Sequence, residues 1–199
     1  MKNQGFTLIE LMIVITIISI IATIAIPSLL RSRMAANETA ALAACKAFAE
    51  AEEIYHRTDY NHDGVLEYAT LLKGTNSLLE TTAGSGDLAL IDKSFANAEG
   101  NSATGIPKAG YVFTVLTAQG FAATGGSRSY VTLAAPLPHM TLGYALSAIP
   151  GAYDGTGRNA FIINNNGTIF QKDRTSTLTT HETFFNPDTS TIGIWTPAE

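Results

Sequence analysis

Acidic residues stand at two places in the chain where their carboxylates could pair with a cation or bind a metal ion. The first is a single carboxylate, Glu10, directly followed by twenty residues without charge, 11–30. An unpaired carboxylate at the head of so apolar a segment is costly in a membrane, so it indicates a site that awaits a cationic partner. The second group is Asp59-Tyr60-Asn61-His62-Asp63-Gly64, with oxygen-bearing side chains at alternate positions and glycine at the sixth. This spacing is typical of a calcium-binding loop.

The calcium loop departs from the full pattern at its twelfth position, which is Thr70 instead of a bidentate glutamate. The ligands that we predict are Asp59, Asn61, Asp63, the backbone of Val65, and Glu67 at the ninth position. A simpler interpretation is a polar turn that ends a helix, because Asp and Asn favour tight backbone geometry. His56 and His62 flank the turn, but a transition-metal site there lacks a cysteine or a third placed histidine.

The uncharged segment 11–30 is long enough for one helical crossing of a bilayer, which needs about 20 residues. A cleaved secretory signal would be shorter and would end at a small-residue cleavage site, which this segment lacks. A plain membrane anchor fits the length but leaves Glu10 unexplained, and the unbroken apolar run disfavours a buried helix of a soluble domain.

The N-terminal sequence Gly5-Phe6-Thr7-Leu8-Ile9-Glu10-Leu11-Met12-Ile13-Val14, with Lys2 before it, resembles the type IV pilin family, which includes the pseudopilins of type II secretion systems. The resemblance implies that a prepilin peptidase removes the leader 1–5 by cutting between Gly5 and Phe6. It also implies that the same enzyme N-methylates the new amine of Phe6. The predicted partners are this peptidase and methyltransferase, an assembly platform with its motor, and further copies of the chain, with or without minor pilins.

Cleavage would explain Glu10 physically, because it creates a cationic amine at Phe6. In a filament core of low dielectric, Glu10 of one subunit can neutralise Phe6 of its neighbour, and this pairing would set the register of adjacent helices. We therefore assign Phe6, Thr7 and Glu10 to filament assembly. The alternative for Thr7 is a simple helix-start residue.

A single helix is predicted over residues 6–58, since strong helix formers dominate 35–55. Residues that recur at three- and four-residue steps give this half one apolar side: Leu42, Cys45, Phe48, Glu52 and Tyr55. Pro27 removes one backbone hydrogen bond, so we expect a kink or a locally melted stretch there, or a mere kink at the membrane edge.

Beyond the helix, residues 59–199 form a globular head. We divide it into an αβ-loop over 59–109, with helical turns at 68–72 and 85–91, an antiparallel sheet over 110–172, and a tail over 173–199. Strands are predicted at 110–116, 129–133, 142–148, 159–164 and 167–171, the last two joined by a hairpin at Asn165-Asn166-Gly167. The fold class is α+β, a long helix packed on an antiparallel sheet, as in pilins.

Composition argues against other classes of function. The four histidines are scattered and no nucleophile or phosphate-binding motif occurs, so we predict no enzyme. The net charge is −5 with only 12 Lys and Arg, which gives no support to nucleic-acid binding. Cys45 has no second cysteine to pair with, and is interpreted as a small buried apolar residue.

The function that we expect is a structural subunit of a type IV pilus, held in the bacterial inner membrane as a single-pass precursor and then added to an extracellular filament. One alternative is a pseudopilin that builds a short periplasmic piston. A second is a membrane-anchored binding or adhesion module that never polymerises. No cofactor is required by this function, and calcium is the one candidate, at the loop that begins with Asp59.

Overall fold

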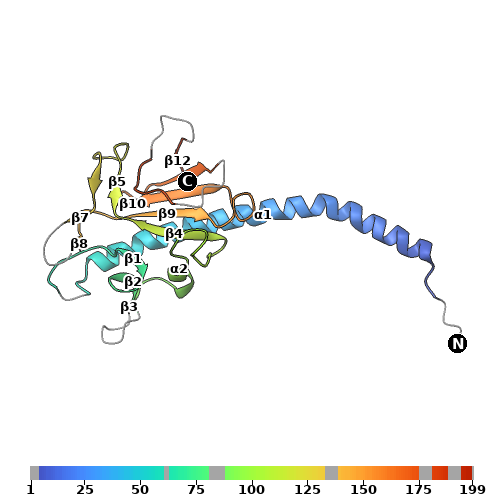
Figure 1. The fold of residues 1–199 in the computed structure, drawn as a ribbon, viewed down its shortest axis with the longest axis horizontal. Helices are drawn as coiled ribbons and strands as arrows, with labels where there is room; N and C mark the ends of the chain where they lie inside the picture. Colours follow the sequence, from blue (N-terminus) through green and yellow to red (C-terminus); the bar gives the residue numbers. More distant parts are fainter. Residues whose placement is uncertain are drawn as a thin grey trace.

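The computed structural model describes residues 5–60, 63–80, 88–132, 139–174, 181–187 and 194–198. One long helix, α1 (Leu8–His56), joins a head that is built on an antiparallel sheet, and the N-terminal half of α1 projects from that head (Figure 1). This arrangement confirms the predicted α+β fold.

Helix α1 has a well-defined start and continues without interruption. Thr7 is the N-cap, and its side chain accepts a hydrogen bond from the backbone N–H of Glu10. The 49 residues of the helix extend about 73 Å at 1.5 Å per residue. The helix continues through Pro27, so this structure does not contain the locally melted stretch that was one of the expectations there. The N-terminal half, drawn in blue, bends away from the axis of the second half (Figure 1).

The two halves of α1 have different surroundings. Among the described residues, α1 is the one helix that is long and apolar enough to cross a membrane. The most apolar stretch of α1 lies in its N-terminal half, and no residue of that stretch is buried in the head. The second half buries the side that the spacing predicted, with Cys45, Phe48 and Tyr55 all buried. Phe48 packs edge-on against Tyr144, with 5.7 Å between ring centroids. The helix is therefore held to the head by this second half alone.

The main sheet contains five antiparallel strands in the order β12-β11-β10-β9-β4. Chain order and spatial order agree from β4 to β12, as expected for a meander. The bounds are β4 Tyr111–Leu116, β9 Ala145–Pro150, β10 Asn159–Asn164, β11 Ile169–Asp173 and β12 Thr196–Pro197. The predicted hairpin is confirmed between β10 and β11, and Gly167 in its turn has a φ of +77°.

Both edges of this sheet are short or covered. Strand β12 has two residues and ends at Pro197, which has no N–H to donate. At the other edge, the backbone of Phe113 in β4 donates to the carbonyl of Ala98 and accepts from the N–H of Gly100, each at 2.9 Å. The segment that follows α2 (Lys93–Asn97) therefore occupies part of the β4 edge.

The region between α1 and β4 differs from its prediction. Residues 68–72 are not a helical turn, because strand β1 (Leu71–Lys73) occupies their end and pairs with β2 (Ser77–Glu80). The described part of 85–91 likewise contains a strand, β3 (Leu88–Ala89), paired with β2. Among the residues that the structure describes here, the one helix is α2, which is capped by the side chain of Asp92.

The predicted strand 129–133 does not join the main sheet. Its described residues contribute to two small pairs, β5 (Ala118–Gln119) with β6 (Arg128–Ser129), and β7 (Val131–Thr132) with β8 (His139–Met140). Buried Tyr130 lies between them and donates to the side chain of Gln119 at 2.9 Å. The strand predicted at 142–148 begins instead at Ala145, since Gly143 has a φ of +146°.

Candidate functional sites

The N-terminal site is a capping box formed by Thr7 and Glu10. The carboxylate of Glu10 accepts from the backbone N–H of Thr7 at 2.9 Å and from its hydroxyl at 2.6 Å. The Thr7 hydroxyl in turn accepts from the backbone N–H of Glu10 at 3.3 Å. This reciprocal arrangement stabilises the first turn of α1, so Thr7 does act as a helix-start residue.

Phe6 and Glu10 lie on an exposed end of the molecule. Phe6 is 89% exposed, and no ion pair among the described residues involves Glu10. The roles assigned to Gly5, Phe6 and Glu10 depend on cleavage and on neighbouring subunits, so they stay predictions.

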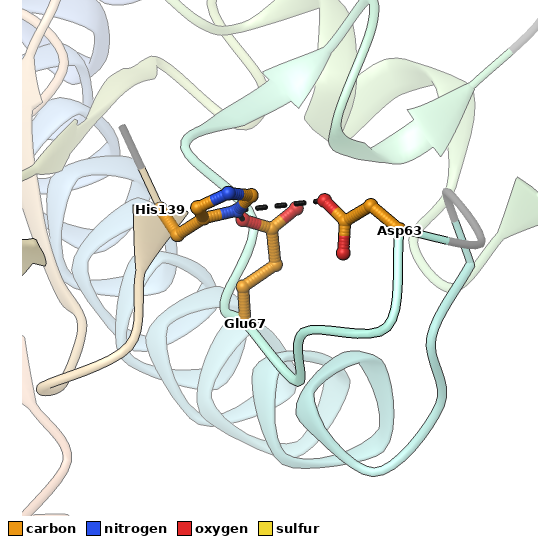
Figure 2. Close-up of side chains that lie close together, drawn as sticks. All are labelled: Asp63, Glu67 and His139. Atoms are coloured by element: carbon orange, nitrogen blue, oxygen red, sulfur yellow. Dashed lines mark hydrogen bonds and ion pairs between the residues drawn. The ribbon is translucent and has the colours of Figure 1, made fainter. Parts of the chain in front are cut away.

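A second site brings together three side chains from two distant segments. His139, in β8, places its Nδ1 atom 2.7 Å from a carboxylate oxygen of Glu67 and 3.5 Å from one of Asp63. Figure 2 shows the two carboxylates converging on the same edge of the imidazole ring. Glu67 and His139 are each 6% exposed, whereas Asp63 is more open to solvent. We call Asp63, Glu67 and His139 the acid–histidine cluster.

The local fold of the predicted calcium loop positions this cluster. Asp59 follows the end of α1, and its carboxylate accepts from the backbone N–H groups of Asp63 and Gly64 at 3.2 and 2.9 Å. Asp63 accepts from the N–H of Val65 at 2.8 Å. Asn61 lies outside the described residues. Binding of calcium to this loop stays a prediction.

Backbone pairing holds the two segments of the cluster in contact. The N–H of Tyr68 donates to the carbonyl of Met140 at 2.7 Å, directly beside Glu67 and His139. Tyr55 of α1 is buried, and burial together with the charge of Glu67 raises the pKa of its phenol. The site is therefore rich in negative charge and partly shielded from water.

Two polar side chains outside the cluster, those of Glu52 and His181, form hydrogen bonds within the head. Glu52 on α1 is fully buried, and one of its oxygens accepts from the N–H of Ala69 at 2.9 Å. Burial raises the pKa of this carboxyl group well above its ordinary value. His181 contacts the hydroxyl of Ser147 at 3.0 Å and the carbonyl of Gly100 at 2.8 Å. Burial lowers the pKa of this imidazole to about 4.

Comparison with family models gives the family. The model described as "Protein of unknown function (DUF2950)" matches residues 23–194, which is most of the chain. The chain belongs to the DUF2950 family. A further model, the prokaryotic N-terminal methylation motif, matches residues 1–26 of this DUF2950 protein. That match confirms the resemblance to type IV pilins and type II secretion pseudopilins at the N-terminus.

Two curated proteins are similar to this DUF2950 chain. The type IV wide pilus major component PilA4 of Thermus thermophilus is 48% identical over 56 residues, which are 28% of the chain and 43% of PilA4. The type II secretion system core protein G of Escherichia coli is 34% identical over 79 residues, 40% of the chain and 50% of that protein. The DUF2950 chain thus spans half or less of each relative's length. No solved structure matches it.

Sequence reasoning found two members of the acid–histidine cluster but missed the third. Asp63 and Glu67 stood among the predicted calcium ligands, whereas His139 is 72 residues away from Glu67. No local spacing connects residues so far apart, so only the fold reveals that they meet. The two histidines considered earlier for a transition metal, His56 and His62, differ from this one: His56 stacks on Tyr68, and His62 lies outside the described residues.

Proposed function

We propose that this chain is a structural subunit of a type IV pilus filament, and that it polymerises through the N-terminal half of α1 after its leader is removed. The observation that carries the proposal is the apolar, wholly uncovered first half of a helix whose second half is built into the head. Such a surface requires another cover, first the lipid of the inner membrane and then the same helix of neighbouring subunits.

The extent of this surface sets the energetics of assembly. Sixteen large apolar side chains between Phe6 and Leu30 are exposed. Covering each contributes about 1.5–3 kcal/mol, so a subunit taken from the membrane into water would lose some tens of kcal/mol. Transfer into a filament must therefore replace lipid contacts directly with helix contacts, and we expect it to depend on an external motor.

Glu10 gives the proposal its specificity. Its hydrogen bonds to Thr7 satisfy the carboxylate but do not neutralise its charge. Burial of an ionised carboxylate among packed helices is expensive unless a cation is present. The amine of a processed Phe6 on a neighbouring subunit would supply that cation, so correct register would neutralise both groups together.

A pair of substitutions at Glu10 separates its charge from its capping role. Glutamine can complete a capping box as glutamate does, whereas alanine cannot. We expect that Glu10→Gln and Glu10→Ala both insert in the membrane and both fail to form filaments, as measured by electron microscopy and immunoblotting of sheared surface fractions. Normal filaments from Glu10→Gln would show that the charge is unnecessary and would refute the pairing.

A pseudopilin of a type II secretion system is the second candidate. It is favoured by the similarity to core protein G, which covers 79 residues and so extends beyond the membrane half of α1. Expression at native level distinguishes the two functions: a pilus subunit gives long surface filaments, whereas a pseudopilin gives none and its deletion blocks export of secreted proteins. A chain that never assembles but still supports attachment would favour an adhesion module instead.

A further inference from the structure

The acid–histidine cluster has the composition of a metal site. Its three ligand atoms, one nitrogen and two carboxylate oxygens, all lie within 4.8 Å of one another. They come from the loop after α1 and from β8, so an ion bound between them would connect two segments that are distant in the chain.

The distances are close to those that a small dication requires. Zinc lies about 2.0–2.2 Å from nitrogen and oxygen ligands, so in a tetrahedral site two ligand atoms stand about 3.3 Å apart. The Nδ1 atom of His139 is already 3.5 Å from Asp63, and its 2.7 Å distance to Glu67 would lengthen by about 0.6 Å. Asp63 is partly exposed on a loop and can make this small adjustment.

Charge and donor type indicate which metal fits. The donor set is one imidazole nitrogen and two carboxylate oxygens, both of which are ligand types that divalent ions accept. An imidazole nitrogen favours zinc and its first-row neighbours, whereas calcium prefers a shell made only of oxygen. Both carboxylate oxygens of Asp59 accept from backbone N–H groups of the loop, which makes Asp59 a positioning residue for Asp63.

We propose that Asp63, Glu67 and His139 bind a divalent transition metal of the zinc type, which clamps the loop after α1 to strand β8. The ion takes the position of the proton between Nδ1 and Glu67: in a neutral imidazole that proton moves to Nε2, and in an imidazolium it is released to solvent while Nε2 keeps its own. The clamp stands beside the hydrogen bond from Tyr68 to Met140 and reinforces the same junction. This site is independent of whether the chain forms filaments.

The test uses the full chain, purified in detergent with a tag that contains no histidine and freed of metal by a chelator. Zinc binding is measured by calorimetry and cobalt binding by visible absorption, which reports tetrahedral nitrogen and oxygen ligation. We expect one equivalent of each metal. At a zinc concentration of 100 times Kd, we expect Tm of the head to rise by about 5–10 °C.

Three variants identify the ligands. His139→Gln should abolish the cobalt spectrum, and Asp63→Asn should weaken zinc binding at least about tenfold. His56→Gln is the matched control, because it removes a nearby histidine that stacks on Tyr68 and is outside the cluster. It should leave the stoichiometry and affinity unchanged. If His139→Gln does not fold, the zinc affinity of Asp63→Asn tests the proposal, because Asp63 is partly exposed and its substitution should leave the fold intact.

Two results would overturn the proposal. One is zinc or cobalt binding that is absent, is not stoichiometric, or keeps wild-type affinity in Asp63→Asn. The other is a Tm increase with calcium that equals the increase with zinc and persists in His139→Gln. That second outcome would favour the all-oxygen calcium loop predicted at Asp59, Asn61, Asp63, Val65 and Glu67 instead.

Discussion

The buried carboxyl group of Glu52 should make the head less stable as the pH rises. Its ordinary pKa is 4.5, and burial raises the pKa well above that in the folded chain. Above pH 4.5 the unfolded chain loses this proton while the folded chain keeps it. The contribution of Glu52 to stability is thus complete below pH 4.5 and is lost as the pH increases toward the folded pKa.

The substitution Glu52→Gln removes this penalty and keeps an oxygen for the N–H of Ala69. Each pH unit above 4.5 corresponds to about 1.4 kcal/mol, which gives an upper limit of about 3 kcal/mol at pH 7. The other carboxyl oxygen has no hydrogen-bond partner, so the amide N–H groups of glutamine would cost about 1 kcal/mol there. We therefore expect Glu52→Gln to stabilise the head at pH 7, by at most about 2 kcal/mol, and to destabilise it slightly at pH 4.5.

The assay is urea unfolding of the full chain in detergent, followed by fluorescence of the single tryptophan, Trp195, which is buried. Circular dichroism should report the same transition. The matched control is Glu53→Gln, which removes a half-exposed neighbouring acid and should change stability by less than about 0.5 kcal/mol. If Glu52→Gln and the wild type differ in stability by the same amount at pH 4.5 and pH 7.5, Glu52 does not have a raised pKa in the folded chain.

Three further outcomes are expected in the same unfolding assay. The pKa of His181 is lowered to about 4 from 6.5, so its contribution to the stability of the head is complete above pH 6.5 and is lost as the pH falls toward 4. This loss of stability is at most about 3 kcal/mol, and His181→Gln should reduce it. Gly157→Ala should lower the free energy of unfolding by about 1–3 kcal/mol, because the new methyl group would overlap the phenol of Tyr111. Gly155→Ala is the control, because its methyl group would make only ordinary contacts, and it should change stability by less than about 0.5 kcal/mol. Phe48→Ala should lower the free energy of unfolding by about 3–5 kcal/mol, because it leaves a cavity where the buried ring of Phe48 packs against Tyr144. Ile54→Ala, at a half-exposed position of the same helix, should lower it much less.

The parts of the fold that local patterns determine could be predicted from the sequence. Helix α1 follows from an apolar run and from the spacing of Cys45, Phe48 and Tyr55, all of which are buried. The β10–β11 hairpin follows from Asn-Gly in its turn, because glycine accepts the positive φ that the turn requires. Both signals lie within a few residues of the element that they specify.

The parts that depend on distant partners could not be predicted. Residues 71–73 are extended because the amides of Leu72 and Lys73 donate to the carboxylate of Glu99, each at 3.1 Å, and because β2 pairs beside them. Neither partner is visible in the local pattern of helix-forming residues. The same limitation hid His139, whose meeting with Glu67 depends on the path of β7 and β8.

The short or covered edges of the main sheet matter wherever many of these heads are packed close together. A long free strand invites a neighbouring molecule to add its own strand, and such growth leads to irreversible aggregates. Here β12 has only two residues, the second of which is Pro197, and the Ala98–Gly100 backbone occupies part of the β4 edge. Many copies can therefore be concentrated side by side with little risk of amyloid-like fusion, so that contacts between them are left to side chains and to α1.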